Sequence, residues 1–517
     1  MAENISAQDL TPITDRFETI QQNSITSLEA SENALWIGPG LNRILDSELD
    51  IYVPQNADSV FFGRGRVFSL SVSQDTVLAG LGYNSSFGDE SIQTAQGFYK
   101  SVDNGNNWQF LEFPLDPRPA DGCDGESVGA PCDIEFTYGD ETYIRTRITV
   151  PQQSPPFEVD FRGDVILSVN WASGLLRSID GGESWERLIL PPSSETELTP
   201  SETYEWNSLT ESGEVVNRYD PRYDNNLLGF GLLIDDEDRV WVGTASGINI
   251  STNALTAPLH EIEWTRIPKS SQEDGLPGNW IVNIREQPET DRVWMSTWST
   301  GPDDENGLVY TDNGGETFSH FLMSERVNDI GFFDGSIFVA ADRGLFISRD
   351  DGNSWERIEQ IRSANTFIKQ DAIYYSIAST NDQIWVGTSD GLASSQDNGE
   401  NWSIIRVDVP LSGGNIYQPD APDVNTYAYP NPFSPNQHGT VRIKYEATKA
   451  GSSQLSVYDF AMNPVYTSPK VSISLEGSYE FTWDGQDQTG RYAASGPYIY
   501  VIDTAGKQID GKILLID

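Results

Sequence analysis

GLFISRDDGNSW, residues 344–355, is the stretch of sequence that decides the fold. A short apolar strand starts at a glycine and ends at Ser348, and Asp350 and Gly352 then occupy a turn before Trp355. A short carboxylate accepts hydrogen bonds from backbone N–H groups of its own turn, while glycine takes the positive φ that the turn requires. The stretch therefore predicts two antiparallel strands joined by a stapled turn, with the indole ring buried against the hairpin.

The same Ser/Thr-x-Asp-x-Gly-x-x-Trp pattern recurs along the chain. Strict copies contain Asp103, Asp180, Asp350 and Asp397, and a weaker copy has Asn313 with Phe318 in the place of the tryptophan. A second apolar strand recurs seven times, as LWIG (35–38), VLAG (77–80), VILS (165–168), VWVG (240–243), VWMS (293–296), IFVA (337–340) and IWVG (384–387). Four strands in each of seven units predict an all-β chain with a seven-bladed β-propeller.

These motifs resemble the Asp-box (BNR) repeats of sialidases, sortilin-type receptors, xyloglucanases and photosystem-assembly propellers. The resemblance implies that the Asp-box side chains, Asp103, Asp180, Asn313, Asp350 and Asp397, are structural staples rather than catalytic groups. We assign residues 1–23 to an N-terminal segment and residues 24–410 to the propeller.

A second domain is predicted after a linker rich in Pro, Gly and Asn at residues 411–426. Alternating strands such as VRIKYEA (441–447) and PYIYVID (497–503) predict a small Ig-like β-sandwich over residues 427–517. YPNPFSP (429–435), followed by VYDF and WDGQDQTG, is similar to the C-terminal sorting domain of type IX secretion substrates and to the Ig-like domain of flagellar hook-capping proteins. The resemblance implies export by the outer-membrane secretion machinery; a spacer without a sorting role is the alternative.

Charge and composition indicate which classes of partner the chain can bind. The chain carries 32 basic and 78 acidic residues, a formal net charge of −46, which repels nucleic acid and anionic membranes. We read the acids as a solvated surface, with surface Ca²⁺ binding as the alternative, and expect no other cofactor and no metal site. No apolar run is long enough to cross a bilayer. MAENISAQDL lacks the regions of a signal peptide, so a secreted or cell-surface bacterial protein presupposes a removed leader.

The two cysteines, Cys123 and Cys132, stand close together in CDGESVGAPC. In an oxidising compartment such a pair predicts a local disulfide that pins a long loop.

Long insertions are expected on one face of the propeller. Residues 81–96 and 297–306 fall between second and third strands, and residues 114–163 and 191–226 fall between blades. In an up-and-down blade both kinds of connection leave the face opposite the Asp boxes, and loops sharing a face of a rigid scaffold commonly bind ligands. Aromatic and acidic residues of these loops are our candidate contacts, with packing of their own loops as the alternative for each: Tyr83, Phe87, Tyr204, Trp206, Tyr219, Tyr223, Trp298, Asp303 and Asp304.

The sequence favours a binding protein over an enzyme. It contains no Ser-His-Asp arrangement, phosphate-cradling glycine loop or nucleotide fingerprint, and TRIP at 265–268 stands too late in the ring for the Arg-Ile-Pro element of sialidases. We expect a surface binding or adhesion module whose partner is a carbohydrate or a protein. A glycoside hydrolase using a carboxylate pair, and a self-assembling component of a surface structure or filament, are the alternatives.

Overall fold

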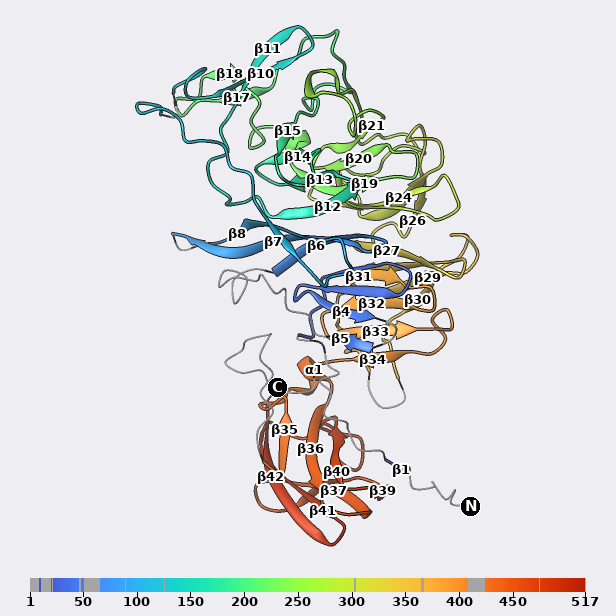
Figure 1. Cartoon of the computed structure of the whole chain (residues 1–517). Coiled ribbons are helices and arrows are strands. Elements are labelled where there is room, and N and C mark those ends of the chain that lie inside the picture. The colour runs from blue at the N-terminus through green and yellow to red at the C-terminus, as the bar shows by residue number, and fades with distance from the viewer. Residues whose placement is uncertain are drawn as a thin grey trace.

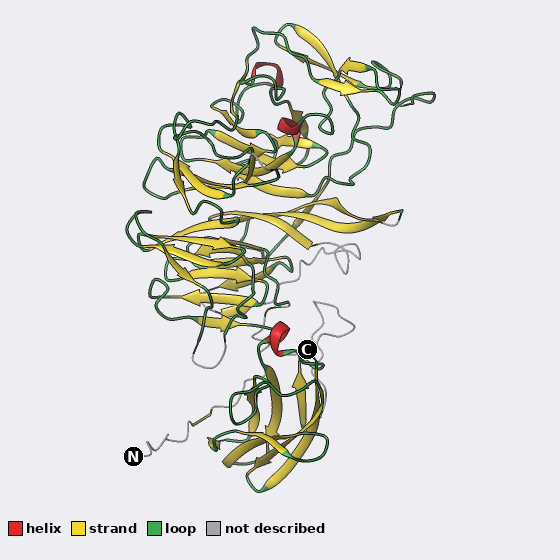
Figure 2. Cartoon of the chain, turned by 180° about the vertical axis from the view of Figure 1, so that it is seen from behind, coloured by secondary structure: helices red, strands yellow, loops and turns green. Residues whose placement is uncertain are grey.

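The structure is a computed structural model. It describes residues 9–10, 20, 22–45, 48–50, 66–88, 90–124, 126–301, 304–363, 367–407, 424–473 and 475–516. Strands make up nearly all of its regular structure, as Figure 2 shows, and helices are limited to single turns. No helix of these residues is long and apolar enough to cross a membrane.

The described residues contain seven antiparallel sheets built on four up-and-down strands that pair in chain order; six have these four strands alone and one has a fifth. The first three are β2 (Ser27–Ala30), β3 (Ala34–Gly38), β4 (Asn42–Leu45) and β5 (Glu48–Asp50); β6 (Arg66–Ser73), β7 (Thr76–Phe87), β8 (Glu90–Ser101) and β9 (Gln109–Glu112); and β12 (Pro156–Arg162), β13 (Val165–Asn170), β14 (Gly174–Ser178) and β15 (Glu186–Leu188).

The remaining four sheets follow the same order. They are β19 (Gly229–Ile234), β20 (Val240–Thr244), β21 (Gly247–Ser251) and β22 (Trp264–Ile267); β23 (Trp280–Glu286), β24 (Val293–Trp298), β25 (Gly307–Thr311) and β26 (Ser319–Phe321); β27 (Val327–Phe333), β28 (Ser336–Ala341), β29 (Gly344–Ser348) and β30 (Glu356–Ile358); and β31 (Tyr374–Ser379), β32 (Ile384–Thr388), β33 (Gly391–Ser395) and β34 (Ser403–Ile405).

The sheets close into a ring through their first strands. Each first strand contacts the first strand of the next sheet, and the last of them, β31, contacts β2. The closure includes a hydrogen bond of 2.9 Å from the Ile25 N–H to the Thr388 carbonyl. The fold is therefore an all-β propeller whose first strands surround a central channel.

Small residues end the second strands because neighbouring sheets approach closely there. A Cβ placed on Gly243 would lie 2.4 Å from the carbonyl oxygen of Ile281 on the next sheet. Bulky apolar residues of the same strands fill the space between sheets, and Trp36, Trp241 and Trp294 are completely buried. The alternation of large and small residues in the sequence repeat is thus a packing requirement.

The insertions leave the ring where the sequence places them but then fold over its outer edge. β10 (Ile134–Tyr138) pairs with β11 (Glu141–Arg145), and β17 (Asn207–Leu209) pairs with β18 (Val215–Asn217), far from the C-terminal domain in Figure 1. β16 (Glu197–Leu198) adds a fifth strand outside β22. The 3₁₀ turns η1 (Asn225–Leu227) and η2 (Leu259–Glu261) complete this region.

A hydrogen bond fixes the insertion to the rim. The Tyr138 hydroxyl donates to the Ile262 carbonyl at 2.9 Å, just before the outermost strand β22. The expectation that the insertions gather on one face is therefore corrected for residues 114–163 and 191–226: these two insertions pack against the outside of the ring, because their own apolar residues need a covered surface.

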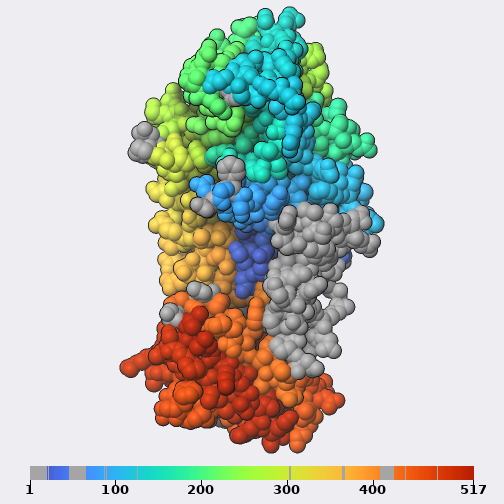
Figure 3. Space-filling model, turned by 90° about the vertical axis from the view of Figure 1, so that its left-hand side faces the viewer, coloured from blue at the N-terminus to red at the C-terminus, as the bar shows by residue number. Residues whose placement is uncertain are grey.

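The C-terminal domain is a β-sandwich that lies below the propeller in Figures 1 and 3. One sheet contains β35 (Thr426–Tyr429), β36 (Val441–Ala447) and β40 (Gly477–Trp483), and a short helix α1 (Pro435–His438) precedes β36. The other contains β1 (Asp9–Leu10), β37 (Gly451–Tyr458), β38 (Pro464–Thr467), β39 (Val471–Ile473), β41 (Gly496–Thr504) and β42 (Lys507–Leu515). Phe433, Trp483 and Tyr500 are buried between the sheets.

Candidate functional site

A repeated β-bulge shapes the mouth of the central channel. In six of the first strands the register shifts by one residue near the start of the strand. The residues at the shift, which therefore share one level of the ring, are Phe68, Phe157, Phe230, Val282, Asn328 and Tyr375. Bulges redirect side chains away from a regular strand.

Aromatic rings form a continuous row at this level, which we call the aromatic row: Phe68, Phe157, Phe230, Trp171 and Trp280. Ring centroids are 6.4 Å apart for Phe68 and Phe157, 5.9 Å for Phe157 and Phe230, and 4.8 Å for Phe230 and Trp280, which stack. Trp171 contacts both Phe230 and Trp280. All five side chains are only half-buried, so the row presents a large apolar surface at the mouth.

The aromatic row borders a cavity of about 580 Å³. Its lining comes from the first strands of five sheets, the residue before β2 and the ends of β24 and β28: Thr26, Phe157, Phe230, Trp280, Val282, Trp298, Arg326, Asn328, Asp342, Ile373 and Tyr375. A concave, mainly apolar surface with few polar groups is the usual form of a ligand site.

The polar groups of the cavity are largely engaged with one another. Arg326 lies over the ring of Trp298, 3.9 Å from its centroid, and forms an ion pair of 3.9 Å with Asp342. The Asn328 amide donates to the Asp342 carboxylate at 3.0 Å and to the Tyr374 carbonyl at 2.8 Å. These contacts fix the side chains in place before any ligand arrives.

A layer of charged residues lies next to the aromatic row. Its members come from the first strands β2, β12, β23 and β27. We call Glu29, Glu158, Asp160, Arg285 and Asp329 the channel cluster. Arg285 forms ion pairs of 3.4 Å with Asp329, 3.9 Å with Glu158 and 4.0 Å with Glu29. Three carboxylates therefore share one guanidinium, and Asp160 lies beside them without an ion pair to Arg285.

The four carboxylates of the channel cluster differ in the hydrogen bonds that they accept. Asp329 accepts backbone hydrogen bonds from Ile330 and Ile377, and Asp160 accepts one of 2.7 Å from Ile234 on the neighbouring sheet. Within the described residues, by contrast, the Glu158 carboxylate accepts no hydrogen bond and has only its long ion pair with Arg285.

Burial dominates the ionisation of the cluster. It raises the pKa of Glu29 to about 7 and the pKa of Glu158 to about 8, because Arg285 offsets only part of the desolvation. Burial also raises the pKa values of Asp160 and Asp329. No group of three or more His, Cys, Asp or Glu residues in the described chain is arranged to hold a metal ion.

Of the residues predicted from the loops, Trp298 lies in the cavity, and its indole N–H donates to the Val327 carbonyl at 2.6 Å. Three others are buried in the core of the insertion: Tyr204 is 7% exposed, Trp206 1% and Tyr219 4%. The Trp206 indole donates to the Leu190 carbonyl at 3.0 Å. In this structure the three rings pack their own loops, because the insertion is large enough to require a core of its own.

The other loop candidates are scattered. Tyr83 is half-buried on β7, and Tyr223 is 45% exposed with the Arg222 guanidinium over its ring. Asp304 forms an ion pair of 3.4 Å with Lys269. Asp303 and the side chain of Phe87 lie outside the described part of the structure.

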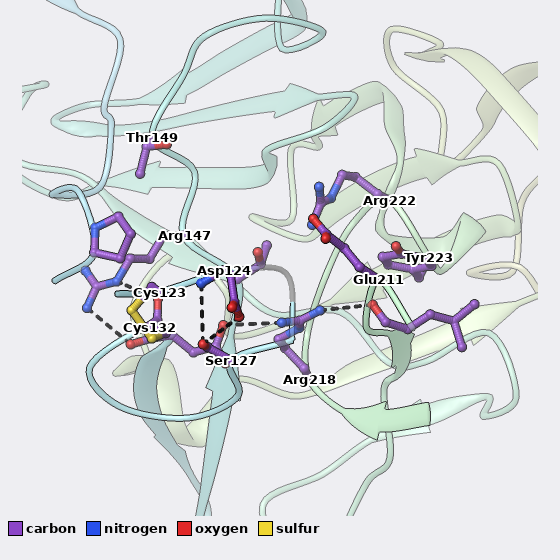
Figure 4. A pocket seen from close by; sticks show the side chains of 14 residues that line it. Cys123, Asp124, Ser127, Cys132, Arg147, Thr149, Glu211, Arg218, Arg222 and Tyr223 are labelled. Carbon is purple, nitrogen blue, oxygen red and sulfur yellow. Dashed lines mark hydrogen bonds and ion pairs between the residues drawn. A yellow bond between two sulfur atoms is a disulfide. The ribbon is translucent and has the colours of Figure 1, made fainter. Parts of the chain in front are cut away.

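A smaller polar pocket of about 260 Å³ surrounds the disulfide between Cys123 and Cys132, and Figure 4 shows its lining. Its guanidinium groups are occupied by the protein itself: Arg147 donates to the Cys132 carbonyl at 2.9 Å, and Arg218 to the Ser208 hydroxyl at 3.2 Å. This pocket supports the insertion rather than offering an open binding surface.

The turn of the Asp-box motif has the same pattern of hydrogen bonds in each copy of the motif. Ser348 donates to the Asp350 carboxylate at 3.0 Å and accepts the Gly352 N–H at 2.8 Å, and the Ser354 N–H donates to Asp350 at 2.8 Å. Corresponding bonds surround Asp103, Asp180, Asn313 and Asp397. These hydrogen bonds lower the pKa of the Asp350 carboxyl. One further turn keeps the pattern across an insertion, since the Glu263 N–H donates to Asn253 at 3.0 Å.

Sequence reasoning missed the aromatic row and the channel cluster. A signal was present: Phe68, Phe157, Phe230 and Tyr375 stand 9, 8, 10 and 9 residues before the second-strand motifs that start at 77, 165, 240 and 384, and they fall in one column of the first strand once the turns of different length are gapped. The column has this meaning only once the ring brings the first strands together around the channel.

Together these features define a β-propeller with an aromatic channel mouth, followed by a β-sandwich. Residues 432–507 match the family profile of the FlgD Ig-like domain, which gives the sandwich its class.

Other known proteins are similar to this chain over parts of their length. The chain is 23% identical over 175 residues to an oligoxyloglucan-reducing end-specific xyloglucanase of Emericella nidulans, covering 30% of this chain and 21% of the relative. It thus spans about a fifth of the length of that curated relative.

Solved structures with a similar chain course include PorZ, a surface component of the type-IX secretion system of Porphyromonas gingivalis, with 14% identity, TM-score 0.36 and coverage of 96% of this chain and 75% of that one. The GH74 enzyme of Niastella koreensis has 11% identity, TM-score 0.44 and coverage of 96% and 73%. YCF48 of Cyanidioschyzon merolae has 14% identity, TM-score 0.41 and coverage of 72% and 96%.

Proposed function

We propose that this chain is a secreted or cell-surface binding protein of the Asp-box propeller type. Its propeller binds a ligand at the mouth of the central channel, and its Ig-like domain serves as a type IX sorting domain for export. Each four-stranded sheet is one blade of a seven-bladed ring.

The aromatic row is the observation that carries the binding proposal. Folding normally buries large apolar rings, yet the five rings of the row stay partly exposed, and three of them, Phe157, Phe230 and Trp280, line a cavity of about 580 Å³. Rigid aromatic rings provide a large contact area at a small cost in conformational entropy, which is why they dominate the energetics of recognition sites.

The experiment is a combined glycan and peptide array probed with the full chain, followed by affinity measurements on its strongest ligand. Trp280→Ala removes a stacked ring and is expected to weaken binding at least tenfold, in line with about 1.4 kcal/mol or more for an aromatic contact. Tyr223→Ala is the matched control, since that ring lies exposed on the insertion. Equal affinity of Trp280→Ala and the unmodified chain would reject the site.

The sorting proposal depends on the sandwich and its motifs. YPNPFSP joins the end of β35 to the start of α1, and β42 closes the larger sheet at the end of the described chain. Removing residues 427–517 in a bacterium with type IX secretion should retain the propeller in the periplasm. Normal surface delivery of the truncated chain would assign the sandwich to a spacer role.

A glycoside hydrolase is the second candidate, favoured by one observation. Glu29 and Glu158 share Arg285 in the channel, and burial raises their pKa values to about 7 and about 8, so a protonated carboxyl is available at neutral pH. A hydrolysis screen of oligosaccharides should show turnover that Glu158→Gln abolishes. Binding without turnover supports the binding protein.

A further inference from the structure

We propose that the channel mouth receives a basic side chain, of lysine or arginine, from a partner protein. The inference rests on the proposed function of the mouth and specifies the chemistry of its ligand. The aromatic row would hold the aliphatic part of the side chain, and the cationic end would enter the channel toward Glu158 and Glu29.

The charge of the channel favours a cation. Three carboxylates of the channel cluster are paired with a single guanidinium, and its ion pairs with Glu158 and Glu29 are 3.9 and 4.0 Å long. Such distances are too long for hydrogen bonds, so Glu158 and Glu29 keep acceptor capacity for another donor, and a cation that enters beside them favours their ionised forms. The formal net charge of −46 on the whole chain also draws cations toward its surface.

A further acceptor in the same layer lacks a donor. Asn283 is 5% exposed and its amide nitrogen donates to Asp329 at 2.9 Å, while its amide oxygen is buried without a hydrogen-bond partner among the described residues. Buried polar atoms of native proteins are normally paired, so an unpaired acceptor beside carboxylates fits a ligand that brings N–H donors.

The position of the acids relative to the rings fits a long side chain. Glu158 directly follows Phe157 of the aromatic row on β12, and Glu29 lies three residues beyond Thr26 of the cavity lining. A strand rises about 3.3 Å per residue, so the two carboxylates lie within about 10 Å of the mouth. A lysine has an apolar four-carbon stem and a charged end, and aromatic faces attract cations.

A neutral sugar fits this cavity less well. Among its polar lining residues, the Asn328 amide donates to the Asp342 carboxylate and to a backbone carbonyl, and the Arg326 guanidinium lies over the Trp298 ring. Few groups are left to pair with many hydroxyls, and an unpaired buried hydroxyl is costly. An anionic ligand would meet the carboxylates directly.

In the test, the full chain is titrated with the peptide acetyl-GGKGG-amide and with the same peptide carrying acetyllysine. Calorimetry measures the affinity of each peptide at low and at high salt. We expect the lysine peptide to bind at least tenfold more tightly than the acetylated one, and added salt to weaken it. Glu158→Gln should remove most of that preference, and Glu183→Gln, at an exposed position, should leave it unchanged.

The outcomes separate the inference from the proposed function. Equal affinity for both peptides, or a preference that survives Glu158→Gln, overturns the basic-side-chain proposal. If Trp280→Ala still weakens binding of a neutral array ligand in that case, the mouth remains a binding site of different chemistry. If Trp280→Ala affects no ligand, the proposed function fails as well.

Discussion

Replacing Glu158 by glutamine should stabilise the protein, and the gain should grow as the pH rises from about 4.5 to about 8. Within the described residues its carboxylate accepts no hydrogen bond, so the isosteric amide breaks none, and Arg285 keeps its ion pairs with Glu29 and Asp329. The substitution removes a buried charge that is poorly compensated.

The magnitude follows from the ionisation of Glu158. Burial raises its pKa from 4.5 to about 8, and each pH unit is worth about 1.4 kcal/mol, so full ionisation costs the folded state up to about 5 kcal/mol. The side chain keeps 14% of its exposure, and channel water screens part of the charge, so we expect about 2–4 kcal/mol. The group binds its proton more tightly in the folded state, so stability rises as pH falls through 8 and levels off below 4.5.

The assay is urea denaturation at pH 5, 6, 7, 8 and 9, followed by tryptophan fluorescence of the unmodified chain and the variant. The difference in unfolding free energy should be close to zero at pH 5 and reach its plateau above pH 8. Glu183→Gln, on the exposed surface, should show no such trend. A difference that does not depend on pH, or a variant that is less stable at pH 9, would refute the reasoning.

Three further substitutions test the close packing and the turn hydrogen bonds of the fold. Gly243→Ala places a Cβ 2.4 Å from the Ile281 carbonyl oxygen and should cost about 1–3 kcal/mol in denaturant unfolding. Ser348→Ala leaves the buried Gly352 N–H without its 2.8 Å acceptor and should lower stability by about 1–3 kcal/mol in a thermal melt. Trp206→Ala removes a buried ring from the core of the insertion and should lower the stability of the insertion by about 3–5 kcal/mol. Limited proteolysis between residues 114 and 228 should then be faster.

Each of these has an internal control. Gly301→Ala meets no atom within 4 Å and should leave stability unchanged. Ser348→Thr should be tolerated, since Thr311 makes the same bonds in its own turn. Tyr223→Ala removes an exposed ring and should leave proteolysis unchanged. If a control variant changes stability or proteolysis as much as its test variant does, the contact named for that test variant is not the cause of the change.

The sequence was sufficient for features that depend on neighbouring residues. The turn around Asp350 is completed within seven residues, so its hydrogen bonds could be predicted from the motif alone. The column of small residues at Gly243 and its equivalents likewise follows from the repeat, and its physical reason is the close approach of the next sheet.

Features that depend on ring closure could not be predicted in this way. Phe157, Phe230 and Trp280 stand more than 40 residues apart in sequence, and each looks like an ordinary core residue of its own strand. Trp206 appeared to be a loop residue on a binding face, whereas the insertion buries it. Among the loop candidates whose side chains the structure describes, only Trp298 reaches the cavity, because it ends a strand that borders the mouth.

Hydroxyl-radical footprinting of the full chain, with and without its strongest array ligand, tests the central claim most directly. The ligand should protect Trp280 and Phe230 at the channel mouth and leave Tyr223 on the insertion unchanged. Protection of Tyr223 with no change at the aromatic row would show that recognition takes place on the insertion and not at the channel.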